Sequence, residues 1–166
     1  MIEQALTGAG SAGTEAVAER AAGLLAMLPP EQIAAAAQVL GALMADSYRG
    51  DLRAAAYQIN GGCSDDGFEY FRGWLILQGR EVFERAVADP DSLAEVPAVR
   101  AVAAEVGDLE CEEALGIAHD AYLKATGREL PRDAVTIRYP PVSFAWDPAG
   151  NAQVRIHLPR LDRLLE

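Results

Sequence analysis

Apolar residues recur at helical spacing along most of the chain. The pattern predicts one helix over residues 14–28 and a second over residues 30–48. Two prolines separate them, since Pro29 ends the first helix and Pro30 suits the first turn of the second. A short third helix is expected to end at residues 60–62, Asn-Gly-Gly, because this sequence tolerates left-handed backbone conformations.

The stretch that follows predicts the best-defined helix. Asp66 and Glu69 have the spacing of a capping box, in which each side chain accepts a hydrogen bond from the other residue's backbone N–H. A predicted buried stripe follows this start and comprises Phe68, Phe71, Leu75, Val82 and Phe83, with Trp74 and Leu77 beside it. Gly79 is expected to bend or split the helix, so residues 80–88 could form a separate piece. The Asp-Pro-Asp sequence of residues 89–91 then breaks the pattern.

Two further helices are predicted, over residues 97–106 and 108–126. Residues 1–12 are rich in Gly and Ala and are expected to form a flexible N-terminal tail. The sequence has no internal repeat and no long linker. Residues 13–166 are therefore predicted to form a single helical domain.

The C-terminal part of the chain changes character. Residues 135–139 alternate with the period of a strand, and residues 147–150, Asp-Pro-Ala-Gly, have the composition of a type I turn. This turn would join two extended stretches, 142–146 and 152–158, before a final helical turn at residues 161–165. The predicted fold class is mainly α, a compact multi-helix bundle with a short C-terminal β-hairpin or extended arm.

The charge of the chain limits its partners. The formal net charge is −11, and no stripe of Lys and Arg offsets it. Nucleic acids and anionic membrane surfaces are therefore poor partners, because both bind clusters of basic residues. A basic protein or a cationic small molecule is compatible with this charge, although acidity also keeps proteins soluble. No apolar run approaches the ~20 residues that span a bilayer, and the first residues lack a signal-peptide pattern, so we expect a cytoplasmic protein.

The segment from Asn60 to Arg80 has the highest density of polar and reactive side chains. It places a thiol, carboxylates, a phenol, an indole and a guanidinium around one predicted helix N-terminus. The residues expected to bind a ligand or partner are Cys63, Asp65, Asp66, Glu69, Tyr70, Arg72 and Trp74. An ion pair between Glu69 and Arg72, one turn apart, competes with any anion-binding role for the arginine.

Cys63 is expected to be a buried, inert cysteine rather than a nucleophile. The helix N-terminus would lower its pKa, but Asp65 and Asp66 would raise it again, and no histidine is near in the sequence. The carboxylates do not match a calcium loop, and we predict no bound metal or cofactor. Glu112 and His119 share a helix face but lie about 10 Å apart along its axis, too far to bind one metal without a third group. No catalytic residue is assigned.

The sequence from Ala54 to Ile76 contains Asn-Gly-Gly-Cys-Ser-Asp-Asp-Gly-Phe-Glu-Tyr-Phe-Arg-Gly-Trp. It resembles a bacterial family, common in actinobacteria, known as domain of unknown function 4240. The resemblance continues through residues 78–80 and 89–93 and covers roughly residues 30–131. Family members often have Trp in place of Arg53, and a Phe-Trp pair in the first helix where this chain has Ala, Val and Leu. The resemblance implies a shared fold, and it carries over no mechanism.

Three functional hypotheses follow. The first is a small accessory or regulatory binding module, in which residues 64–72, with Trp74 beside them, face a protein partner or a small molecule. The second is a small enzyme acting on a modest organic or peptidyl substrate, with Cys63 or a carboxylate of this segment as its reactive group and His119 or a tyrosine beside it. The third is a structural homodimer, supported only by the Ala-rich helix predicted over residues 30–48.

Overall fold

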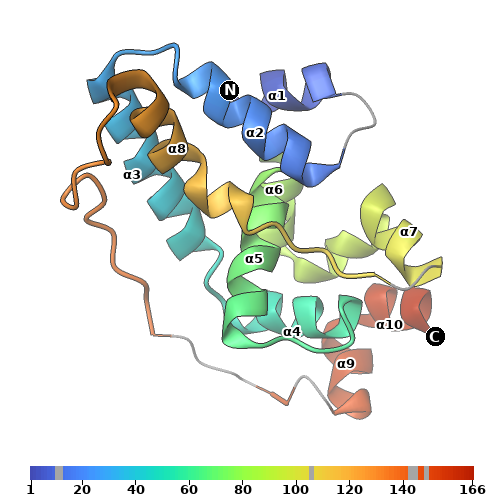
Figure 1. Ribbon diagram of the computed structural model, residues 1–166. Coiled ribbons are helices and arrows are strands. Elements are labelled where there is room, and N and C mark those ends of the chain that lie inside the picture. The colour runs from blue at the N-terminus through green and yellow to red at the C-terminus, as the bar shows by residue number, and fades with distance from the viewer. Residues whose placement is uncertain (10–12, 105–106, 142–145, 148–149) are drawn as a thin grey trace.

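The computed structural model describes residues 1–9, 13–104, 107–141, 146–147 and 150–166. Within these ranges the chain is mainly α, with 11 helices and no strand (Figure 1). The helices are α1 (Ile2–Ala9), α2 (Thr14–Leu25), α3 (Pro30–Asp46), α4 (Gly50–Ile59), α5 (Asp65–Ile76), α6 (Arg80–Ala88), the 3-10 helix η1 (Pro90–Glu95), α7 (Pro97–Ala104), α8 (Glu113–Thr126), α9 (Asn151–His157) and α10 (Pro159–Leu165).

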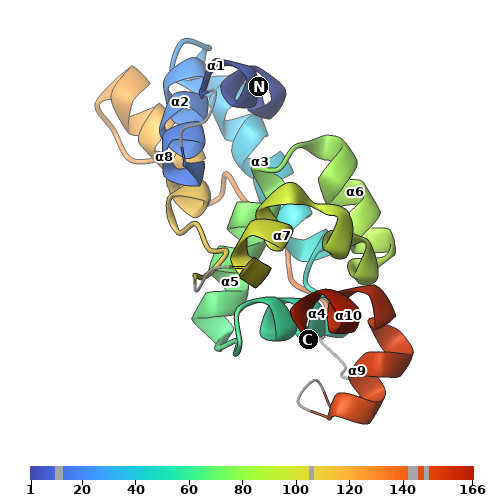
Figure 2. The ribbon, with the colours of Figure 1, turned by 90° about the vertical axis from the view of Figure 1, so that its right-hand side faces the viewer.

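The helices gather at two ends of the molecule, with α5 between them (Figures 1 and 2). At the N-terminal end, α2 and α3 both pack on α8, and α1 packs on α2. At the C-terminal end, α10 packs on η1, α4 and α7. Helix α5 contacts α3, α4, α6 and α8, so it links both ends of the fold.

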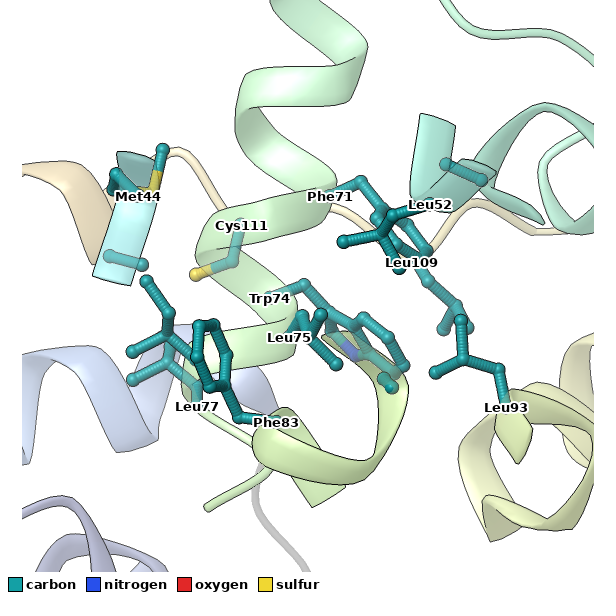
Figure 3. Packing of buried hydrophobic residues seen from close by; sticks show 14 of the residues in the cluster. Met44, Leu52, Phe71, Trp74, Leu75, Leu77, Phe83, Leu93, Leu109 and Cys111 are labelled. Atoms are coloured by element: carbon teal, nitrogen blue, oxygen red, sulfur yellow. The ribbon is translucent and has the colours of Figure 1, made fainter. Parts of the chain in front are cut away.

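Helix α5 is buried on nearly all sides. Phe68, Phe71, Trp74 and Leu75 are all at most 2% exposed, which confirms the buried aromatic stripe predicted for this helix. Figure 3 shows side chains from α3, α4, α6, η1 and the segment before α8 meeting around it. A helix enclosed in this way is stabilised mainly by packing, because each large apolar side chain contributes about 1.5–3 kcal/mol when buried. Within the described residues, no helix is both long and apolar enough to cross a membrane.

Two features of the α5 boundaries follow from local chemistry. Ser64 is the N-cap, and its hydroxyl accepts a hydrogen bond from the Gly67 N–H at 2.9 Å. The predicted capping box is therefore wrong, because Asp66 lies inside the first turn. Gly79 has φ 92°, a left-handed conformation that separates α5 from α6 and confirms the predicted split.

The predicted C-terminal β-hairpin is wrong, since residues 151–157 form α9. Val154 and Leu158 fit both a strand period and a helical period, and Leu161 continues the helical one. These three residues are at most 2% exposed, whereas Ile156, which only the strand period would bury, is 67% exposed. Most of the first arm and half of the turn of that hairpin, residues 142–145 and 148–149, lie outside the described residues.

Both ends of the chain are held by carboxylates that cap distant helices. Where the sequence predicted a flexible tail, Ile2–Ala9 form α1, and the Glu3 carboxylate accepts a hydrogen bond from the Arg80 N–H at the start of α6, at 2.9 Å. Near the C-terminus, the buried Asp91 carboxylate accepts hydrogen bonds from the backbone N–H groups of Arg160 and Leu161. The Arg160 guanidinium also pairs with Asp91, at 2.9 Å, and with two neighbouring carboxylates, Asp89 and Glu95.

Candidate functional site

The structure divides the predicted binding residues into buried and accessible ones. Trp74 and Arg72 are only 2% and 3% exposed, so neither side chain is at the surface to contact a partner. Asp65 and Asp66 are exposed, whereas the remaining three, Cys63, Glu69 and Tyr70, are partly exposed. Asp65 forms an ion pair with Arg53 at 2.7 Å, so its charge is compensated.

Arg72 joins α5 to the C-terminal end of α3. Its Nη1 donates a hydrogen bond to the Met44 carbonyl at 2.5 Å, in the last turn of α3, where helix carbonyls carry partial negative charge. Three aromatic rings surround the guanidinium with centroids 4.9 to 5.3 Å away, those of Tyr48, Phe68 and Tyr139. The predicted pair with Glu69 is not among the ion pairs of the described residues. The arginine is therefore held by structural contacts.

Two glycines allow the segment before α8 to cross α5 at close range. A Cβ on Gly73 would lie 2.5 Å from the Cys111 carbonyl oxygen, and one on Gly67 would lie 2.9 Å from a Glu110 carboxylate oxygen. The Cys111 N–H donates a hydrogen bond to the Tyr70 carbonyl at 3.0 Å, which holds the crossing in register. This crossing carries Glu110 and its neighbour Glu112 to the first turns of α5.

The crossing assembles a surface that we call the acidic face, formed by Asp66, Glu69, Tyr70, Glu110 and Glu112. The pKa of the Tyr70 phenol is raised, first by the Glu112 carboxylate and then by desolvation and by the carboxylates of Asp66, Glu69 and Glu110. Partial burial, followed by the charge of Asp108, raises the pKa of the Glu110 carboxyl. Among the described residues, no Arg or Lys forms an ion pair with these carboxylates. The described residues also contain no group of three potential ligands that could hold a metal ion.

A small groove adjoins the acidic face between α3 and α8. It has a volume of about 210 Å³, and residues 130–139, which we call the covering segment, form one wall of it. Its lining is mainly apolar and includes Leu40, Gly41, Met44, Leu115 and Val135. Glu69 and His119 supply charged or polar groups, and Tyr139 of the covering segment reaches the same cavity. Because Glu69 belongs to both features, the groove and the acidic face form one continuous site.

The two thiols are poorly suited to nucleophilic chemistry. Burial raises the pKa of the Cys63 thiol, and the nearby Arg53 guanidinium only partly opposes this effect. Burial also raises the pKa of Cys111 to about 11. A thiol needs an adjacent base or positive charge to form the reactive thiolate. His119 lines the groove described above, whereas Cys63 does not.

A second groove of about 550 Å³ lies between α2 and α8. Its charged lining comprises Glu15, Glu19, Glu113, Asp120 and Lys124. Alanines and Gly23 form its floor. This groove is larger and lined by acidic residues, and it lacks the mainly apolar lining of the groove beside Glu69.

The sequence did not identify Glu110 as a site residue and considered Glu112 only as a metal ligand. Three glutamates within residues 110–113 were visible, but nothing local indicated that they lie near α5. The position of these glutamates beside α5 depends on the close approach at Gly73 and on the backbone hydrogen bond from Cys111 to Tyr70. Both are contacts between segments that are distant in the sequence.

A family model described as "Protein of unknown function (DUF4240)" matches residues 1–124. The chain belongs to the DUF4240 family. The match confirms the resemblance seen in the sequence, and it begins earlier and ends earlier than the range predicted from it. No curated protein and no solved structure matches the chain. In this DUF4240 protein the acidic face lies within the matched residues, whereas the covering segment, α9 and α10 lie beyond them.

Proposed function

We propose that this DUF4240 protein is a small accessory or regulatory binding module whose partner is a protein carrying an apolar side chain beside basic residues. The observation that carries the proposal is the acidic face itself. Carboxylates from α5 and from the segment before α8 converge there next to an apolar groove, and the ion pairs found among the described residues do not include them.

The arrangement of charge supports a partner rather than a role in stability. Like charges brought together repel one another, so the acidic face opposes folding slightly. A basic partner would relieve this repulsion and would be attracted from a distance, an effect that increases association rates and weakens as salt is added. Tyr70, at the centre of the face, offers an aromatic ring against which a guanidinium or ammonium group can pack.

The size of the groove supports a protein partner over a small molecule. Cavities that enclose a drug-sized ligand are typically about 300–1,000 Å³. The groove beside Glu69 has about 210 Å³, enough for one large side chain. Protein interfaces are commonly anchored by one such side chain in a pocket with a polar rim.

The small-enzyme hypothesis has less support from the described site. Its sequence-based version used Cys63 with His119, yet the histidine faces a groove that Cys63 does not line, and burial raises the pKa of the thiol. The homodimer through the Ala-rich α3 stays a prediction. The groove side of α3 is contacted by the covering segment, which leaves Val39, on another part of its surface, 59% exposed.

The test compares two triple variants that remove equal charge. The acidic-face variant combines Asp66→Asn, Glu69→Gln and Glu112→Gln. The control variant changes three exposed glutamates elsewhere, namely Glu19→Gln, Glu31→Gln and Glu81→Gln. Tagged wild type and both variants are used to capture proteins from a host related to the natural source, at low and at raised salt.

We expect at least one protein that is captured by the wild type and the control but lost with the acidic-face variant, and whose capture weakens as salt rises. Circular dichroism and thermal melting of the three proteins show that the fold is intact. Identical sets of captured proteins for all three would refute the proposal, because they would show that the acidic face contributes nothing to recognition.

A further inference from the structure

The covering segment is held on α3 by the side chain of one glutamine. The Gln38 Oε1 atom accepts a hydrogen bond from the Thr136 backbone N–H at 3.0 Å. The Gln38 Nε2 atom donates to the Thr136 hydroxyl at 3.1 Å. A side-chain amide thus takes the place of the backbone partner that an extended chain would find in a sheet.

The side chains around Thr136 show that the segment is extended at this point. A Cβ on Gly41 would lie 2.7 Å from a Val135 side-chain atom and 3.5 Å from an Ile137 side-chain atom. Residues two positions apart reach the same spot only when the backbone is extended. Farther along, the ring of Tyr139 packs against Tyr48 at an interplanar angle of 36°, with centroids 5.1 Å apart, and its centroid lies 5.3 Å from the Arg72 guanidinium carbon.

The hold is nevertheless light. Val135, Ile137 and Tyr139 are 40%, 37% and 48% exposed, so each buries only part of its apolar surface. Both hydrogen bonds to Gln38 are exposed to solvent, where the net contribution of each is small. Contacts of this strength can be exchanged for equivalent contacts with another chain.

We propose that the α3–α8 groove binds an extended peptide of the partner, with apolar residues at alternate positions and a basic residue among them, in place of residues 135–139. The covering segment is the intramolecular competitor for this peptide. The proposal deepens the proposed function and rests on it, because it states how the partner enters the same site.

The chemistry of the groove supports this class of peptide. Gln38 binds a backbone N–H, which every residue except proline provides, and the missing side chain of Gly41 leaves room for apolar side chains at alternate positions. Glu69 lies at the rim of the groove and belongs to the acidic face, so a basic residue of the peptide meets negative charge. The covering segment itself has this composition, Val-Thr-Ile-Arg-Tyr.

The experiment uses the full chain and a fluorescein-labelled synthetic peptide with the sequence of residues 130–141. Thr136→Pro in the chain removes the N–H and the hydroxyl that Gln38 binds, and it keeps the preceding residue in an extended conformation. A second variant, Val135→Ala with Ile137→Ala, weakens the apolar contacts instead. Trypsin cleavage after Arg138 reports whether the segment is released, and a scrambled peptide controls for charge.

A flexibly tethered segment competes at an effective concentration on the order of 1 mM. For a sequence that binds the open groove with a Kd of about 0.1 mM, release of the segment should therefore tighten peptide binding by about tenfold, as measured by fluorescence anisotropy. Adding Gln38→Ala to either variant should remove most of this gain. The proposal is overturned if faster trypsin cleavage brings no gain in affinity, if cleavage is unchanged in both variants, or if the scrambled peptide binds equally well.

This test fails independently of the capture experiment. In one case peptide affinity increases on release of the segment, but the acidic-face variant captures the same proteins as the wild type. This result refutes only the proposed role of the acidic face in recognition. Loss of captured partners with no gain in peptide affinity refutes only the extended-peptide mode of binding.

Discussion

Replacing Gly73 by alanine should destabilise the protein, although the same substitution at an open helical position, Gly23, should stabilise it. A Cβ on Gly73 would lie 2.5 Å from the Cys111 carbonyl oxygen and 3.1 Å from the Ala114 Cβ. Ordinary contacts between carbon and a carbonyl oxygen begin at about 3.3 Å, so the segment before α8 would have to move by roughly 0.8 Å. The hydrogen bond from the Cys111 N–H to the Tyr70 carbonyl holds it in place.

The magnitude follows from opposing effects. Overpacking of a well-filled site costs about 1–3 kcal/mol. Weakening the hydrogen bond to Tyr70 adds about 1 kcal/mol. The higher helix propensity of alanine offsets about 1 kcal/mol. The net loss expected for Gly73→Ala is therefore about 1–3 kcal/mol in the free energy of unfolding.

Gly23 provides the matched control, because nothing lies within 4 Å of a Cβ placed there in α2. Gly23→Ala should stabilise the protein by up to about 1 kcal/mol through helix propensity alone. Urea unfolding followed by circular dichroism measures both variants against the wild type. If Gly73→Ala is as stable as Gly23→Ala, the segment before α8 does not cross α5 at this distance, and the acidic face built on that crossing is wrong.

Two further predictions concern charge. Glu112→Gln should lower the pKa of Tyr70 toward the ordinary value for tyrosine, because the Glu112 carboxylate is the main group that disfavours the phenolate; an NMR titration of the tyrosine ring carbons would show it, and an unchanged pKa would contradict the geometry. Asp91→Asn should weaken the docking of α10 by about 2–4 kcal/mol, because the buried carboxylate caps α10 and pairs with Arg160. Hydrogen exchange at the Leu161 amide measures this loss, and unaltered protection there would refute it.

Most helices were predictable because their signals are local. The apolar spacing in α2 and α3, the two prolines between them and the left-handed Gly79 each act within a few residues. The cap of α5 was misplaced by two positions, since Ser64 and Asp66 both precede a plausible first turn and only the observed hydrogen bond selects Ser64. The error at α9 has a similar origin, because Val154 and Leu158 satisfy two periods at once, and only their burial in the core, where α9 packs on α10, selects the helical period.

The candidate binding surface was less predictable. The segment around Tyr70 was identified from its density of polar and aromatic residues, but density does not show which side chains are accessible. Trp74 and Arg72 have turned inward, because an indole and a guanidinium surrounded by aromatic rings are stabilised by packing on neighbouring helices.

Local chemistry along the chain was thus enough to specify the mainly α fold and the position of its central helix. The acidic face, the groove beside Glu69 and the docking of the covering segment on Gln38 depend on contacts between residues far apart in the sequence. The physical reason is that helix formation is decided by neighbours within one or two turns, whereas the convergence of like charges is opposed locally. The convergence of these carboxylates is imposed by tertiary packing, in which glycines such as Gly73 lie against a distant backbone.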